Sequence, residues 1–248
     1  MDISKSREFY EEFFAEDSSE NPVRNYWNRQ RYEILFQLIE QADFENDINV
    51  LEVGSGSGRI SRWLDSRFTN VFAVDIGLFG QMQCTIDDTD VNFALGALPN
   101  LPFSDEFDLV ICSEVLEHLP SRDMQQEAVE ELSSVADENG TVIITTPNPM
   151  SIRERTADLI GNLKGIVGGS SEPNDSGGQL VENWIPPTIL QSYFSEHFFI
   201  RDHRGSYYTV PDRGTGLAKH LRPISDYITR RNLAPNRGVY QYYVLEVD

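Results

Sequence analysis

Residues 50–58 read Val-Leu-Glu-Val-Gly-Ser-Gly-Ser-Gly, an apolar run that ends in a glycine-rich turn. The run is β-branched and alternates little, which is typical of a strand buried on both faces of a sheet. The glycines that follow permit a tight turn and a close approach of a ligand to the backbone. Helical spacing of apolar residues resumes at Ile60, Trp63 and Leu64. We therefore predict a strand, a glycine turn and a helix, in this order.

A second apolar run, residues 71–74, ends in Asp75, which lies 21 residues after Gly54. An acid at the tip of the second strand stands where a bound ribose presents its hydroxyl groups, so the two runs predict a nucleoside-binding corner. Dinucleotide sites favour G-x-G-x-x-G and bring a pyrophosphate to the helix N-terminus. Here the pattern is G-x-G-x-G and Glu52 precedes it. A carboxylate there repels phosphate and suits a ligand that carries an ammonium and a sulfonium.

This turn resembles the first motif of the class I S-adenosylmethionine-dependent methyltransferases, an acid-x-Gly-x-Gly-x-Gly whose acid is matched by Glu52. Three later segments resemble further blocks of that family in the same order: 101–110, 113–119 and 140–148. The resemblance implies an α/β fold with a Rossmann-like, seven-stranded, mostly parallel sheet. It also implies helices on both faces of the sheet and an antiparallel last strand.

The same resemblance implies S-adenosyl-L-methionine as cofactor. The residues expected to bind it are Glu52, Gly54, Ser55, Gly56, Gly58, Asp75, Ala97 and Leu98. Glu52 and the glycines would hold the methionine portion, and Asp75 the ribose. Members of the family usually have Gly-Asp after the third strand, and the Asp contacts the adenine amino group. Here the pair is Gly96-Ala97, so recognition of adenine is expected to rest on backbone groups or on another side chain.

Glu114, Glu117 and His118 have the spacing i, i+3, i+4, which would place them on one side of a helical turn. Ubiquinone-pathway O-methyltransferases and small-RNA 2′-O-methyltransferases carry a similar Glu-x-x-Glu-His and use it to hold a divalent cation such as Mg²⁺. Such an ion would lower the pKa of a substrate hydroxyl. Those relatives supply a further histidine downstream, for which Glu182 is the plausible substitute here. A metal-free structural pair is the alternative interpretation.

The mechanism we expect is an in-line displacement in which an acceptor oxygen attacks the sulfonium methyl group. The protein aligns the two groups and excludes water. If the nucleophile is a hydroxyl, a base is needed, and His118 is the first candidate, followed by Glu114. If it is a carboxylate, no base is needed.

The 248 residues divide into an N-terminal helical cap, 1–44, and a methyltransferase domain, 45–248. A Gly- and Ser-rich stretch at 150–178 is expected to form a lid-like loop, and a basic insert spans 201–237. The cap carries apolar residues at helical spacing that should pack on the domain: Tyr32, Leu35, Phe36 and Ile39.

We expect a cytoplasmic protein with reduced thiols. Apolar runs stay shorter than the ~20 residues of a membrane span, and the acidic, aromatic start differs from a signal peptide. Cys84 and Cys112 lie in or near segments predicted to be buried, without metal-like spacing.

The net charge is −20, from 40 acids and 20 bases, and only three of the bases are lysines. Such a surface disfavours nucleic acid. It is similar to the acidic proteins of salt-loving organisms, so a halophilic origin is our hypothesis.

The basic insert has eight bases and three acids, a net charge of +5, whereas the rest of the chain has a net charge of −25. This contrast favours an anionic partner, and Arg230 and Arg231 are the candidate substrate-binding residues. The alternative is that these arginines pair with acids of the body. An apolar stripe in the insert leaves peripheral membrane contact as a further possibility: Leu217, Leu221, Ile224 and Ile228.

The substrate interpretation that we favour is a small acidic molecule or a glycan intermediate, for example a uronic acid of a surface glycan. A quinone or lipid precursor is the next alternative. A non-catalytic partner subunit that binds S-adenosylmethionine is an alternative of another class, and a nicotinamide oxidoreductase is a third.

Overall fold

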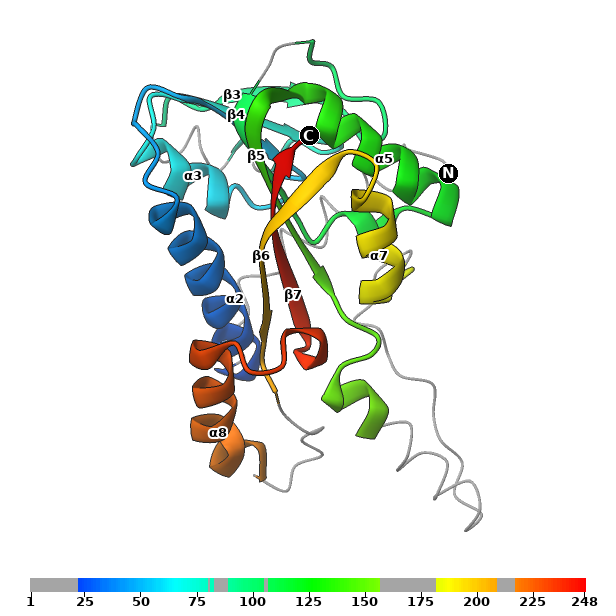
Figure 1. Ribbon diagram of the computed structural model, residues 1–248. Helices are drawn as coiled ribbons and strands as arrows, with labels where there is room; N and C mark the ends of the chain where they lie inside the picture. The colour runs from blue at the N-terminus through cyan, green and yellow to red at the C-terminus, as the bar shows by residue number, and fades with distance from the viewer. Residues whose placement is uncertain (1–21, 80, 83–88, 105–106, 157–181, 209–216) are drawn as a thin grey trace.

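The computed structural model describes residues 22–79, 81–82, 89–104, 107–156, 182–208 and 217–248. In this part of the chain seven strands form one sheet with the order β3-β2-β1-β4-β5-β7-β6. The strands are β1 Asn49–Val53, β2 Asn70–Asp75, β3 Asn92–Leu95, β4 Phe107–Ser113, β5 Ala136–Pro147, β6 Phe198–Ser206 and β7 Tyr240–Val247. The first five are parallel, and β7 is antiparallel to both of its neighbours (Figure 1). The predicted mostly parallel sheet with an antiparallel last strand is confirmed.

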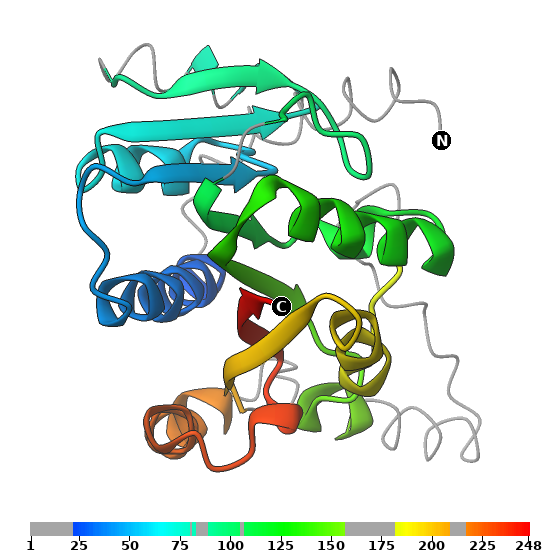
Figure 2. The same ribbon diagram turned by 45° about the horizontal axis from the view of Figure 1, so that its top comes forward.

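Helices cover both faces of this sheet. They are α2 Pro22–Gln41, α3 Arg59–Asp65, α5 Arg122–Val135, α7 Pro187–Phe194 and α8 Leu217–Arg231, with the short 3-10 helices η1 Leu116–His118 and η2 Pro235–Arg237. Successive residues of β4 point to opposite faces. Leu109 and Ile111 join the core beneath α2 and α3, whereas Val110 and Cys112 join the core beneath α5 and α7. Figure 2 shows the two pairs of helices on opposite sides of the sheet.

Helix α2 packs on the sheet through the apolar stripe that the sequence indicated. Leu35 and Ile39 are buried, and Phe36 stacks on Trp63 of α3 with ring centroids 4.0 Å apart. The first 21 residues of the predicted cap lie outside the described residues. The cap and domain boundary therefore stays a prediction.

The basic segment 201–237 is only partly an insert, which corrects our expectation. Its first residues belong to β6, where Arg201 pairs with Glu246 and Arg204 lies 2.7 Å from Asp202. These two arginines therefore pair with acids of the body of the protein, which was the alternative to an anion-binding role.

The later part of that segment forms α8, which continues through Pro223. The helix is held to the end of β6 by the buried Ser225, whose hydroxyl accepts a hydrogen bond from the Tyr208 backbone N–H at 2.9 Å. A proline removes one backbone donor from a helix, and this tertiary contact helps to hold the helix in spite of it. Residues 209–216 lie outside the described part of the chain.

Two other expectations fall largely outside the described residues. They are the lid-like loop, of which 157–181 is not described, and Cys84. Cys112 is buried and unbonded, as expected. Among the helices that the structure describes, none has the length and apolar character needed to span a membrane.

Candidate functional site

The candidate site lies where the order of the parallel strands reverses, between β1 and β4. In open parallel sheets this switch point opens a crevice at the carboxyl ends of the strands. The Gly54 turn follows β1 and Glu114 follows β4. A Cβ atom on Gly54 would lie 2.3 Å from Cγ2 of Val115, so the two loops are in direct contact. The fold therefore brings together the two constellations that the sequence singled out.

The glycine turn has a backbone that only glycines adopt easily. Gly54, Gly56 and Gly58 have φ angles of 78°, 50° and 69°. The Gly54 N–H donates to the Val74 carbonyl at 2.8 Å, which holds the turn against β2. The Ser55 hydroxyl is buried and has no hydrogen-bond partner. Because an unpaired buried polar group is costly, this hydroxyl is a group that a bound ligand could satisfy.

Asp75 lies at the end of β2, as predicted, and faces the glycine turn. One carboxylate oxygen accepts a hydrogen bond from the Gly56 N–H at 2.8 Å and the other from the Gly77 N–H at 2.9 Å. In nucleoside-binding sheets of this kind, the acid at the end of the second strand is the one that contacts the ribose hydroxyls. The residues present thus fit a nucleoside.

Glu52 lies behind the turn and is 1% exposed. Its carboxylate accepts a hydrogen bond from the Ser61 hydroxyl of α3. Burial, with a further contribution from Asp75, raises the pKa of Glu52 to about 8. At neutral pH the group is therefore largely uncharged in this structure, and the sequence argument that Glu52 repels phosphate is weakened.

Residues 96–98 follow β3 and lie beside Asp75, since the Gly96 N–H donates to the Asp75 carbonyl at 3.0 Å. The Leu98 side chain is buried in the core. It is therefore the backbone of Ala97 and Leu98 that could face an adenine, and this assignment stays a prediction.

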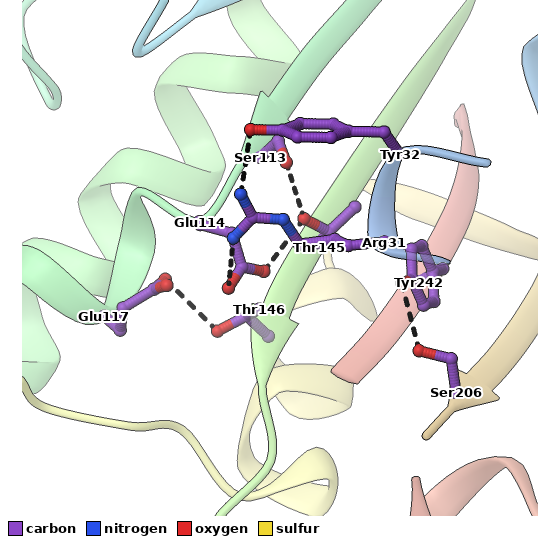
Figure 3. A network of polar contacts seen from close by, with 9 residues as sticks. All are labelled: Arg31, Tyr32, Ser113, Glu114, Glu117, Thr145, Thr146, Ser206 and Tyr242. Atoms are coloured by element: carbon purple, nitrogen blue, oxygen red, sulfur yellow. Dashed lines mark hydrogen bonds and ion pairs between the residues drawn. The ribbon is translucent and has the colours of Figure 1, made fainter. Parts of the chain in front are cut away.

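Beyond β4 the structure reveals a polar network that includes Arg31 of α2 (Figure 3). Glu114 has a left-handed backbone with a φ of 58°. Its carboxylate lies 3.5 Å from Nη1 of Arg31 and accepts a hydrogen bond from the Thr145 hydroxyl at 3.0 Å. Glu117 accepts a hydrogen bond from the Thr146 hydroxyl at 3.3 Å. Two buried or nearly buried acids are thus held at the ends of β4 and β5.

The two acids differ in their charge balance. Burial raises the pKa of Glu114, and Arg31 opposes this effect. Burial, and then the proximity of Glu114, raise the pKa of Glu117 well above its usual range. Burial thus raises the pKa of both carboxyl groups, and the rise is greater for Glu117, which also lies beside Glu114.

The predicted metal set is not supported. Glu114 is turned towards Arg31 and Thr145, while Glu117 and His118 belong to η1, so the three do not form one helical turn. Within the residues that the structure describes, no group of three or more His, Cys, Asp and Glu side chains could hold a metal ion. The segment that contains Glu182 does run beside η1, because the N–H of its neighbour Asn183 donates to the Glu117 carbonyl at 2.7 Å.

The sequence did not single out Arg31, because its contact with Glu114 forms only when α2 packs on the sheet. Tyr32 was expected only to pack on the domain, and Tyr240 was not singled out; both rings lie beside the Arg31 guanidinium. Arg230 and Arg231, the predicted substrate-binding residues, lie exposed in the last turn of α8.

Residues 51–144 match a protein family described as "Methyltransferase domain". The chain is 30% identical over 151 residues to a ubiquinone biosynthesis O-methyltransferase from Rickettsia bellii, an alignment that covers 57% of this chain and 55% of that protein. The chain thus spans about half the length of the curated relatives it matches.

Solved structures share the fold at low identity. The N-methyltransferase NodS from Bradyrhizobium japonicum, solved with S-adenosyl-L-homocysteine, has a TM-score of 0.60 and 13% identity over 98% of both chains. The PH0226 protein from Pyrococcus horikoshii has a TM-score of 0.60 and 18% identity over 89% of this chain and 90% of that one. These two structures show a shared fold. The match to the methyltransferase-domain family and to the ubiquinone biosynthesis O-methyltransferase confirms the resemblance to class I S-adenosylmethionine-dependent methyltransferases.

Proposed function

We propose that this chain is an S-adenosylmethionine-dependent methyltransferase that methylates an oxygen of a small acidic molecule or glycan intermediate, for example a uronic acid of a surface glycan. The observation that carries the proposal is the glycine turn after β1, which the Asp75 carboxylate holds through the Gly56 N–H. This turn borders the loop of Glu114 and Val115 at the switch point of the sheet. Cofactor and acceptor groups would therefore meet at one crevice.

S-adenosylmethionine, when bound, supplies a sulfonium methyl group to the acceptor oxygen. Asp75 would accept hydrogen bonds from the ribose hydroxyls, and Ser55 would pair its free hydroxyl with the ligand. Glu52 would support the turn from behind through Ser61. The backbone of residues 97–98 would line the adenine edge. The complex of NodS with S-adenosyl-L-homocysteine supports this choice of cofactor.

A hydroxyl acceptor must lose its proton, and two groups of this chain are candidates to take it. His118, in η1, is the first. Glu114 is the second: burial raises its pKa, Arg31 opposes this effect, and only a charged carboxylate can accept a proton. Glu117 is a poorer base, since burial favours its protonated form.

The proposal is tested by the affinity for S-adenosyl-L-homocysteine, measured by calorimetry. We expect Asp75→Ala to weaken binding by about 1–2 kcal/mol, through the loss of charged hydrogen bonds and of support for the turn. Asp108→Ala is the matched control, because Asp108 also accepts a backbone hydrogen bond, from the Asn49 N–H at 2.8 Å, but at the opposite end of β1. Equal affinities of the two variants would remove Asp75 from the site.

A quinone or lipid precursor is a second candidate acceptor, favoured by the 30% identity to a protein named ubiquinone biosynthesis O-methyltransferase. Formation of S-adenosyl-L-homocysteine with a panel of catechols and sugar acids would separate the two.

Binding of S-adenosylmethionine without turnover on every fraction of a cell extract would favour the non-catalytic alternative. A chelator should abolish activity only if the cation predicted at Glu114, Glu117 and His118 is required.

A further inference from the structure

Arg31 extends from α2 to the carboxyl ends of β4 and β5, where it meets Glu114 (Figure 3). The side chains of Arg31 and Glu114 are 18% and 16% exposed. The pair is therefore neither sealed in the core nor free on the surface. Part of each side chain is exposed to solvent.

Two tyrosines flank the guanidinium of Arg31. Its Cζ atom lies 4.8 Å from the ring centroid of Tyr32 and 5.8 Å from that of Tyr240. Its Nη2 donates to the Tyr32 hydroxyl at 2.9 Å. Arg59, from the start of α3, lies 5.1 Å from the same Tyr32 ring. Cations near aromatic faces form favourable contacts. Both tyrosines are half-buried, so part of each ring is exposed to solvent beside the guanidinium groups.

The guanidinium of Arg31 has donor capacity left. Its Nε is buried and has no hydrogen-bond partner. The contact of Nη1 with Glu114 is 3.5 Å long, whereas strong charge-assisted hydrogen bonds measure about 2.7–2.9 Å. A ligand carboxylate could therefore form a shorter contact with the terminal nitrogens of Arg31 than Glu114 does.

The charges around the two tyrosines also favour an anion. They include three arginines and two glutamates: Arg31, Arg59, Arg153, Glu114 and Glu154. Glu117 is a third acid near Tyr240, and burial raises its pKa well above its usual range. Three arginines are thus gathered around the two tyrosines, in a chain whose net charge is −20.

We propose that Arg31, Tyr32 and Tyr240 form the acceptor subsite, and that it takes a ring-shaped carboxylic acid whose carboxylate binds Arg31 and whose ring lies against the tyrosines. The inference rests on the proposed function and names the substrate class. It places the recognition of the anion at Arg31 instead of at Arg230 and Arg231. An aromatic acid and a sugar acid share this chemistry, and the experiment distinguishes them.

Two pairs of probes test the subsite, each an acid with its uncharged counterpart: 3,4-dihydroxybenzoate with catechol, and glucuronate with glucose. Their affinities are measured by calorimetry in the presence and absence of S-adenosyl-L-homocysteine. We expect the wild-type protein to bind at least one acid about tenfold more tightly than its counterpart, a difference typical of one charged hydrogen-bonded contact. The pair that shows the preference identifies the aromatic or the sugar acid.

Arg31→Gln should remove the preference while leaving the affinity for S-adenosyl-L-homocysteine unchanged. Arg67→Gln is the matched control, since Arg67 also pairs with a glutamate, Glu40, at 3.0 Å and lies over a ring, that of Trp63, at 3.8 Å. It should keep the preference. If Arg31→Gln fails to fold, Arg31→Lys retains the charge beside Glu114 but loses the planar fork, and it should reduce the preference.

The proposal is overturned if the wild-type protein shows no preference for either acid. It is also overturned if the preference survives in Arg31→Gln, or if it is lost only in the double variant Arg230→Gln/Arg231→Gln. Absent binding of S-adenosyl-L-homocysteine would contradict the proposed function. The preference measured without that compound would still decide the subsite.

Discussion

Glu52 shows how a residue of the cofactor motif can act from behind the ligand. It is the acid of the glycine motif, yet it is buried and its carboxylate accepts a hydrogen bond from Ser61 of α3. An uncharged carboxyl group suits this position, because a buried charge without a counterion is costly. We infer that Glu52 joins β1 to the first turn of α3 and thereby fixes the glycine turn between them.

The raised pKa of Glu52 makes the stability of the free protein depend on pH. Its pKa rises from 4.5 to about 8 on folding, so between these values the native state binds more protons than the unfolded state. The stabilisation is complete below pH 4.5 and is lost as the pH rises through 8. Relative to Glu52→Gln, the wild-type protein should lose about 3–4 kcal/mol of unfolding free energy between pH 5 and pH 8.5. Urea denaturation at several pH values measures the difference, and a constant difference would contradict the prediction.

At the scale of elements, one side chain of α5 holds two segments that border the site. Gln125 is fully buried. Its Nε2 donates to the Leu116 carbonyl of η1 at 2.9 Å and to the Asn183 carbonyl at 2.8 Å, while its Oε1 accepts a hydrogen bond from Arg122 at 2.7 Å. The Gln125 amide therefore ties η1, which contains Glu117 and His118, to the segment of Asn183.

Gln125→Ala should lower the free energy of unfolding by about 1–3 kcal/mol, because it removes the donor that Gln125 provides to the Asn183 carbonyl and one of two donors to the Leu116 carbonyl, which still accepts from the Leu119 N–H. It should also increase the hydrogen exchange of the Asn183 N–H, which donates to Glu117. Gln191→Ala is the control, since the Gln191 amide makes only a 3.5 Å contact with the Tyr243 hydroxyl. A loss of stability no greater than that of the control would show that η1 is held by its other contacts and does not need the Gln125 amide.

The elements also show which features local sequence could predict. The glycine turn, Asp75 and the helix that ends at Phe194 follow from nearby residues, since apolar spacing, glycines and prolines mark strand, turn and helix. The turn at Glu114 could not be predicted, because its left-handed backbone serves contacts with Thr145 and Arg31, which are distant in sequence. For the same reason the sequence offered no signal for an acceptor subsite built from α2 and β7.

At the scale of the whole molecule, charge is the property that most distinguishes this chain. The acids exceed the bases by 20, and ion pairs such as Arg67 with Glu40 and Arg201 with Glu246 neutralise only part of the excess. Like charges on a compact surface repel one another and destabilise the folded state. The repulsion is screened by salt, with a Debye length of about 30 Å at 0.01 M and about 3 Å at 1 M.

We therefore expect the melting temperature at pH 7.5 to rise by several degrees between about 0.01 M and 1 M KCl, as the repulsion is screened. Salt can also stabilise proteins by exclusion from their surface, an effect that does not require a net charge. The two causes separate at lower pH, because the sequence pI is about 4.5 and the repulsion weakens as this value is approached. Screening therefore predicts a smaller salt effect at pH 5.5 than at pH 7.5, measured by circular dichroism. An equal effect at both pH values would assign the stabilisation to exclusion and would remove the physical basis for a halophilic origin.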